Sequence, residues 1–181
     1  MSKTVALLLV VCALALPPAA LGALPVGAKG TGVLAPGCPI DPVAADVFCP
    51  TNPVWFSLQA EKRPTSIRGV MKTRWLVPGH STTTFSGAVK CVNTVGNAVA
   101  FGGLLTNPRA LAGIPFVEYA VDNGVSGDLV SDLGFFPDED VDFALLPVGF
   151  PTICPAPGLA ASIYGYLSVQ SGDVLVRPPT P

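Results

Sequence analysis

Apolar and polar residues alternate from Phe85 to Val95, as in a strand with one buried face. One parity is apolar or small and holds Phe85, Gly87, Val89, Cys91 and Val95, and the other holds Ser86, Lys90 and Thr94. Gly96-Asn97 marks a tight turn, because both residue types tolerate a positive φ. Ala98 to Leu105 is apolar on both parities, which indicates a central strand. We predict a hairpin over 85–105, with Val89, Cys91 and Phe101 facing the core and Lys90 facing solvent.

Further strands are predicted by the same alternation on both sides of this hairpin. They cover 54–60 and 67–77 before it, and 116–121, 143–148, 162–169 and 173–176 after it. In 116–121, Val117, Tyr119 and Val121 are predicted to face inward and Glu118 outward. A turn at Ser171-Gly172 would make the last two segments a closing hairpin.

A barrel is the architecture that these short strands favour. The chain contains 19 Gly and 20 Pro, which suits strands joined by turns. We predict an all-β fold, a small antiparallel β-barrel of about 7–8 strands, with a β-sandwich as the alternative. Closure into a barrel removes the exposed edges that promote aggregation.

The N-terminal residues have the layout of an export signal. Lys3 supplies a positive charge, Val5 to Leu16 is apolar, and Ala20-Leu21-Gly22 is a small-x-small cleavage site. The apolar run ends at Pro17-Pro18 and is too short to cross about 30 Å of hydrocarbon. We expect a signal peptide over 1–22 and a secreted mature protein with no membrane span. A Gly/Pro-rich arm over 23–53, without regular structure, would then precede a barrel domain over 54–177 and a tail over 178–181.

The cysteines agree with export. Cys12 lies in the signal, and Cys38, Cys49, Cys91 and Cys154 remain. An even number in an exported chain favours disulfides, and a zinc site is disfavoured because the chain has one His and no C-x-x-C. Three pairings are possible. Cys38–Cys49 with Cys91–Cys154 is preferred, because Cys38 and Cys49 lie together in the arm.

The formal net charge of −2 is unevenly distributed, with basic residues before Cys91 and acidic residues after it. The basic set has no interleaved aromatic residues beyond Trp75, so we expect no nucleic-acid partner. One interpretation is that strands from the two halves pair and their charges face each other.

Candidates for catalysis are few. His80 is the only His, it lies in a Pro-Gly turn, and no G-x-S-x-G, GxGxxG or P-loop motif occurs. We interpret His80 as a solvated loop residue and assign no catalytic or cofactor-binding residue. A non-enzymatic role is favoured, while enzymatic activity stays open.

A weak calcium site is the one cofactor hypothesis. Its ligands would come from an acidic segment that contains Asp122, Asp128, Asp132, Asp138, Asp140 and Asp142. Calcium takes about six to eight oxygen ligands, but the spacing does not match an EF-hand. The alternative is a solvated loop, with Asp122 bonding its own turn.

The sequence identifies no partner, and carbohydrate or a protein surface is a candidate class. Trp55 lies on the polar parity of its strand, where an exposed ring can stack on a sugar, and Tyr164 and Tyr166 are further candidates. A binding or structural role is therefore favoured. The alternatives are a small barrel that holds an apolar ligand, and a hydrolase or isomerase at a barrel mouth.

Five short motifs follow one another in the chain: WFSLQA (55–60), F-x-G-x-V-x-C (85–91), VGNAVAFGG (95–103), V-x-Y-A-V-D-N-G (117–124) and SGDVLV (171–176). This order resembles a family of small secreted all-β proteins, commonly bacterial and largely uncharacterised. The resemblance spans 55 to 176. It implies an all-β fold and a Cys91–Cys154 bridge, and it implies no activity.

Overall fold

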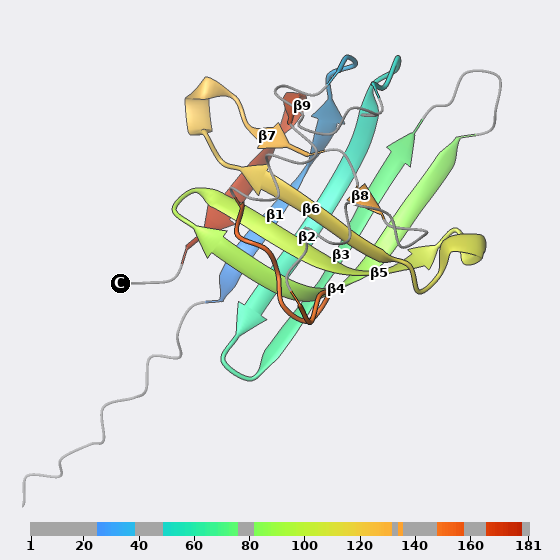
Figure 1. Ribbon diagram of the computed structural model, residues 1–181. Coiled ribbons are helices and arrows are strands. Elements are labelled where there is room, and N and C mark those ends of the chain that lie inside the picture. The colour runs from blue at the N-terminus through green and yellow to red at the C-terminus, as the bar shows by residue number, and fades with distance from the viewer. Residues whose placement is uncertain are drawn as a thin grey trace, which may run out of the picture.

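The computed structural model describes residues 25–38, 49–75, 82–131, 134–135, 148–157 and 166–178. Figure 1 shows the strands β1 (Val26–Leu34), β2 (Val54–Arg63), β3 (Ser66–Trp75), β4 (Thr83–Val95), β5 (Ala98–Asn107), β6 (Pro115–Val121), β7 (Leu129–Val130), β8 (Gly134–Phe135) and β9 (Leu167–Arg177). Two short 3-10 helices, η1 (Arg109–Leu111) and η2 (Gly124–Ser126), lie between strands. Among the described residues no helix is long and apolar enough to cross a membrane.

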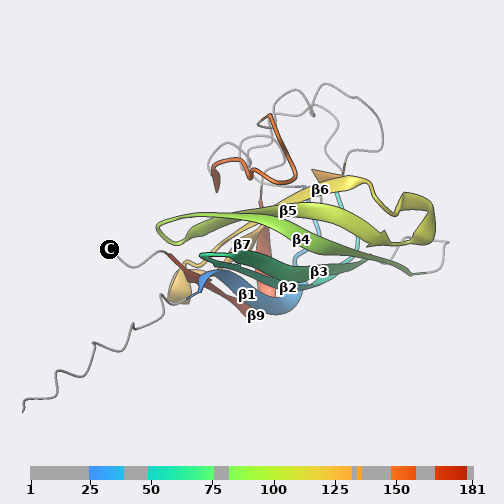
Figure 2. The same ribbon diagram turned by 90° about the horizontal axis from the view of Figure 1, so that it is seen from below.

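The strands form a closed eight-stranded antiparallel β-barrel, which confirms the predicted fold class. Around the ring the order is β5-β4-β3-β2-β1-β9-β7-β6, and pairing of β5 with β6 closes it. β8 is a short addition to β6. Figure 2 shows a flattened barrel, in which β4, β5 and β6 make one wall and β9, β1, β2 and β3 the other.

Large apolar side chains fill the interior between these walls. Phe56, Met71, Phe101 and Phe116 have 0% of their surface exposed, so no space large enough for water adjoins them. Burial of this kind is the main favourable contribution to folding. Val89 and Phe101 belong to this core and Lys90 is exposed, as predicted.

Three expectations about the strands are wrong. The arm without regular structure contains β1, which pairs with both β2 and β9. Two of the inward positions of β1 are glycines, Gly30 and Gly32, so the sequence of this strand shows no clear alternation of apolar and polar residues. A Cβ on Gly32 would lie 2.9 Å from the Phe56 ring, so Phe56 occupies the space that a side chain would take. The closing hairpin is instead a single strand, β9.

No turn forms at Ser171-Gly172, and β9 instead continues through these residues with an irregularity in its pairing to β1. Val33 pairs with Ser171 and Leu34 with Val169, so Gln170 is an extra residue. The remaining predicted strand, 143–148, lies outside the described residues except for Val148, which is in a turn.

The third wrong expectation is that every second residue from Phe85 to Val95 faces the core. A bulge in β4 changes this pattern. Val89 pairs with Gly103 and Cys91 with Gly102, which leaves Lys90 as the extra residue. Beyond it Val92 joins the core, while Val95 is 62% exposed. Cys91 faces away from the core and is buried at 2% exposure, bonded to Cys154. A bulge of this kind reverses which parity faces the core.

Candidate binding face

The outward side chains of β9, β1, β2 and β3 form a broad exposed surface, which we call the open face. The alternation that turns Phe56, Leu58 and Ala60 into the core turns Trp55, Ser57 and Gln59 outward. Strand pairing places the side chains of the open face in three main rows, which are Ser171–Val33–Trp55–Arg74, Asp173–Thr31–Ser57–Lys72 and Leu175–Lys29–Gln59–Val70.

The middle of the open face is hollowed. Thr31 and Ser57 are directly opposite each other on β1 and β2, and both side chains are short. Longer side chains stand around them, including Lys29, Gln59 and Asp173, and the result is a shallow, open hollow. A hollow lined by hydroxyl, amide and charged groups suits a polar ligand lying along the surface.

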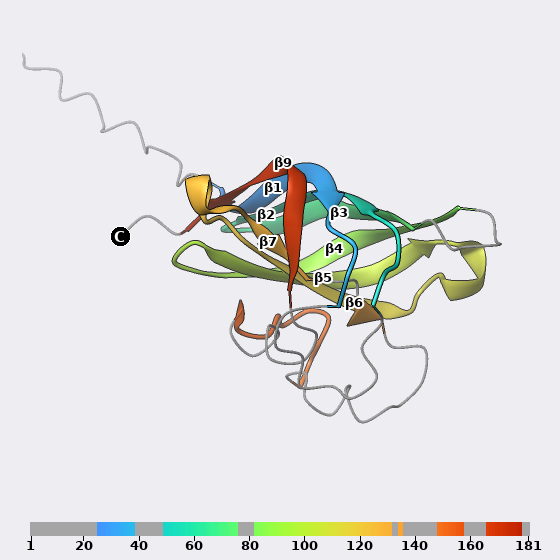
Figure 3. The same ribbon diagram turned by 90° about the horizontal axis from the view of Figure 1, so that it is seen from above.

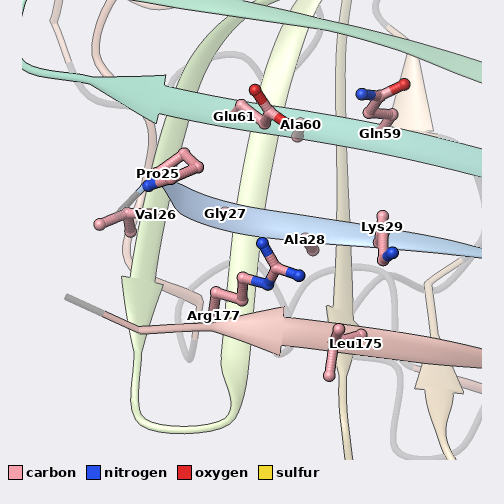
Figure 4. Close-up of a pocket in the computed structure, with 10 residues that line it drawn as sticks. All are labelled: Pro25, Val26, Gly27, Ala28, Lys29, Gln59, Ala60, Glu61, Leu175 and Arg177. Atoms are coloured by element: carbon pink, nitrogen blue, oxygen red, sulfur yellow. The ribbon is translucent and has the colours of Figure 1, made fainter. Parts of the chain in front are cut away.

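A smaller depression adjoins this hollow near the start of β1 (Figure 4). Lys29, Gln59, Glu61, Leu175 and Arg177 surround it, and its volume is about 30 Å³. Ligand pockets in proteins have volumes of about 300–1,000 Å³. The depression is therefore too small to be a separate ligand cavity, and we treat it as part of the uneven surface of the open face.

Positive charge dominates the open face, although the whole chain has a formal net charge of −2. Its cations are Lys29, Arg63, Arg68, Lys72, Arg74 and Arg177, and its carboxylates are Glu61 and Asp173. Arg68 donates from Nε and Nη2 to Glu61 Oε2, at 3.1 and 3.0 Å. Arg63 lies 3.5 Å from the same oxygen. The hydrogen bond from Arg68 lowers the pKa of Glu61 below its ordinary value.

The ion pairing of Arg68 is not shared by Lys29, Lys72 and Arg74. Within the described part of the chain they form no ion pair. The described ion pairs join β2 to β3 or lie within β2, so the interpretation that basic and acidic halves face each other is not supported there. Lys29, Lys72 and Arg74 are exposed and available to a partner.

The opposite wall is covered. The segment 148–157 lies over β5 and β6 (Figure 3) and is joined to β4 by the disulfide Cys91–Cys154. Asn93 Nδ2 donates to the Pro155 carbonyl oxygen at 3.1 Å. A Cβ on Gly102 would lie 2.6 Å from the Phe150 ring, so the ring packs directly on the strand. The second predicted disulfide, Cys38–Cys49, is also present.

Of the two aromatic candidates that the structure describes, Trp55 belongs to the open face, where it is 39% exposed. Tyr166 packs edge-on against the buried Tyr119 on the covered wall, with ring centroids 5.4 Å apart, and its burial raises the pKa of its hydroxyl. Tyr164 and His80 lie outside the described residues.

Two of the six acidic candidates, Asp122 and Asp128, lie among the described residues, and both accept backbone hydrogen bonds. Asp122 Oδ1 accepts a hydrogen bond from Gly124 N at 3.2 Å, as expected for a residue that bonds its own turn. Asp128 accepts from the backbone of Asn123 and Val174. Asp132, Asp138, Asp140 and Asp142 lie outside the described residues. In the described ranges no group of three or more His, Cys, Asp or Glu is placed to hold a metal ion.

Glu118 corrects the predicted orientation of β6. It pairs with Phe101 and alternates with the core residues Phe116 and Ala120, so it faces the interior, where it is 1% exposed. Val117 and Tyr119 face the covered wall. Because both faces of β6 are buried, apolar alternation carries no signal for its orientation.

Comparisons with family models, with curated proteins and with solved structures found no match to this chain.

Proposed function

We propose that this protein is a secreted binding module that recognises an extracellular polysaccharide on its open face. The observation that carries the proposal is the hollow over Thr31 and Ser57, with Trp55 and unpaired cations beside it. Short hydroxyl and amide side chains offer hydrogen bonds to sugar hydroxyls, and an exposed indole offers an apolar surface for a sugar ring.

A polysaccharide fits the open face better than a small ligand fits the barrel. A ligand barrel needs interior space. Here the inward side chains of Phe56, Phe101 and Phe116 have no exposed surface at all. An extended polymer, by contrast, lies on a shallow surface and gains affinity from many modest contacts.

The disulfides support secretion. Cys38–Cys49 and Cys91–Cys154 are the kind of covalent links that persist in oxidising compartments. They also suit a domain that must stay folded outside the cell, since each closes a loop and restricts the unfolded chain.

Filling the hollow tests the proposal. Ser57→Trp places a bulky ring opposite Thr31, and Ser126→Trp places the same ring on the exposed helix η2 as a matched control. Both variants are assayed at low salt against immobilised neutral and acidic polysaccharides, after thermal melts confirm folding. We expect the wild type and Ser126→Trp to bind at least one polysaccharide and Ser57→Trp to lose at least about tenfold in affinity, the equivalent of 1.4 kcal/mol. Equal binding by all three proteins, or binding to none of the panel, contradicts the proposal.

A further inference from the structure

We infer that the ligand of the open face is a carboxylated polysaccharide, a polymer of uronic-acid type, held by Lys29, Lys72 and Arg74. This inference rests on the proposed function and names the chemical class of its ligand. It follows from the placement of the unpaired cations relative to the hollow.

Lys29 lines the polar hollow on β1, and Lys72 and Arg74 lie on β3, on the other side of β2. Lys72 lies beside Ser57, and Lys29 lies beside Gln59 in the next row. Arg74 is two residues along β3 from Lys72, a separation of ~7 Å between their Cα atoms. Each cation therefore has a neutral hydrogen-bonding side chain or Trp55 as its cross-strand neighbour. A chain of sugars that carries acidic groups presents the same alternation of charge and hydroxyl.

The charge density of the open face favours carboxylates over a densely sulfated polymer. Asp173 lines the hollow, where its carboxylate would repel a chain of closely spaced charges. The planar guanidinium of Arg74 matches a carboxylate with two parallel hydrogen bonds. Moderate positive charge with polar side chains between the cations therefore fits a polymer with well-separated carboxylates.

Trp55 adds a contact that a simple ionic surface lacks. It is the cross-strand neighbour of Arg74 and is 39% exposed. Among the described residues of the open face it is the one aromatic side chain, so the face lacks the series of stacking rings that bind single-stranded nucleic acid. One indole beside an arginine suits a single sugar ring with an acidic substituent.

The experiment compares three soluble polymers: polygalacturonate, which is carboxylated; dextran, which is neutral; and dextran sulfate. Binding is measured by affinity electrophoresis at low salt and at about 0.15 M salt, where screening acts over about 8 Å. The variant Lys72→Ala/Arg74→Ala removes two cations of the site. The control Lys62→Ala/Arg109→Ala removes the same charge from exposed positions outside the hollow.

We expect the wild type and the control to prefer polygalacturonate over both other polymers, and to bind it less tightly as salt rises. Lys72→Ala/Arg74→Ala should lose at least about tenfold in affinity and show a weaker dependence on salt. Trp55→Ala should weaken binding without changing that dependence.

Other outcomes separate this inference from the proposed function. If dextran binds as tightly as polygalacturonate and Ser57→Trp abolishes both interactions, the open face is a binding site but its ligand is neutral. If dextran sulfate binds more tightly, the carboxylate assignment is wrong. If the control loses as much affinity as Lys72→Ala/Arg74→Ala, the attraction comes from net charge and the site is wrong. If no polymer binds, both the inference and the proposed function are wrong.

Discussion

Asp128 Oδ2 accepts a hydrogen bond from the backbone N–H of Val174 at 2.7 Å, although the two residues are 46 positions apart. Asp122 Oδ2 accepts in the same way from Val176 N, at 3.2 Å. β9 pairs with β1 along most of its length, but on its other side it pairs with β7 only at Leu167 and Ser168. Among the described residues, no strand pairs with Val174 and Val176 on that second side. Two carboxylates from the turn after β6 therefore close this side of the barrel in place of a strand ladder.

We predict that Asp128→Ala lowers the free energy of unfolding by about 1–3 kcal/mol, because it leaves the N–H groups of Val174 and Asn123 without their acceptor. Asp173→Ala removes an exposed carboxylate from β9 and should change stability by less than about 0.5 kcal/mol. Denaturant melts of the two variants give the comparison. Equal losses would show that Asp128 does not hold β9 in place.

The calcium hypothesis remains a prediction for the segment from Asp122 to Asp142. Asp122 and Asp128 already accept backbone hydrogen bonds, so Asp132, Asp138, Asp140 and Asp142 would have to supply most of the side-chain ligands. The hypothesis predicts a higher melting midpoint in calcium than in chelator, and Asp138→Asn/Asp140→Asn/Asp142→Asn should remove the difference. Identical midpoints over millimolar calcium would end the hypothesis.

Phe101 is predicted to be essential for stability and Lys90 dispensable. Phe101 is wholly buried, so Phe101→Ala should cost ~3–5 kcal/mol by leaving a cavity in the core. Lys90 is the exposed extra residue of the β4 bulge, and Lys90→Ala should cost about 0.5 kcal/mol or less. Urea melts distinguish the two. A damaging Lys90→Ala with a benign Phe101→Ala would mean that the register of β4 and β5 is wrong.

The covering segment 148–157 is predicted to depend on its disulfide. Cys91–Cys154 closes a loop of 63 residues, so Cys91→Ala/Cys154→Ala should lower stability by about 4 kcal/mol in the chain-entropy model. It should also loosen the packing over Tyr119, which near-ultraviolet circular dichroism and dye binding to exposed apolar surface would record. An unchanged aromatic spectrum together with an unchanged melt would contradict this role. Cys38→Ala/Cys49→Ala is the comparison, because it removes a bridge from elsewhere in the chain.

The barrel was predictable from sequence wherever one face of a strand is apolar and the other polar. β2, β3 and the first part of β4 satisfy that condition. β5 is apolar on both faces, and it was found from its continuous apolar run and from the turn at Gly96-Asn97 that joins it to β4. β1 does not, because two of its inward positions are Gly30 and Gly32, and the Phe56 ring occupies the space beside Gly32. β6 fails for the opposite reason, since both of its faces are buried and Glu118 turns into the core.

The candidate site was predictable only in part for the same reason. Trp55 was identified from its place on the polar parity of β2. Lys29 and Thr31 were missed, because they belong to β1 and the arm around it gave no strand signal. The hollow depends on strand pairing between residues far apart in sequence, such as Thr31 and Asp173, which no local pattern encodes.

The most direct test of a ligand site on the open face is an amide chemical-shift map by NMR during titration with short galacturonate oligomers. We predict that the largest chemical-shift changes occur in 29–31, 55–59, 70–74 and 171–175, with little change at Phe101, Phe116 or Tyr119. Changes concentrated at Phe101 and Phe116 would place the ligand inside the barrel, and changes concentrated around Tyr119 and Cys154 would place it on the covered wall. Either result would contradict a ligand site on the open face.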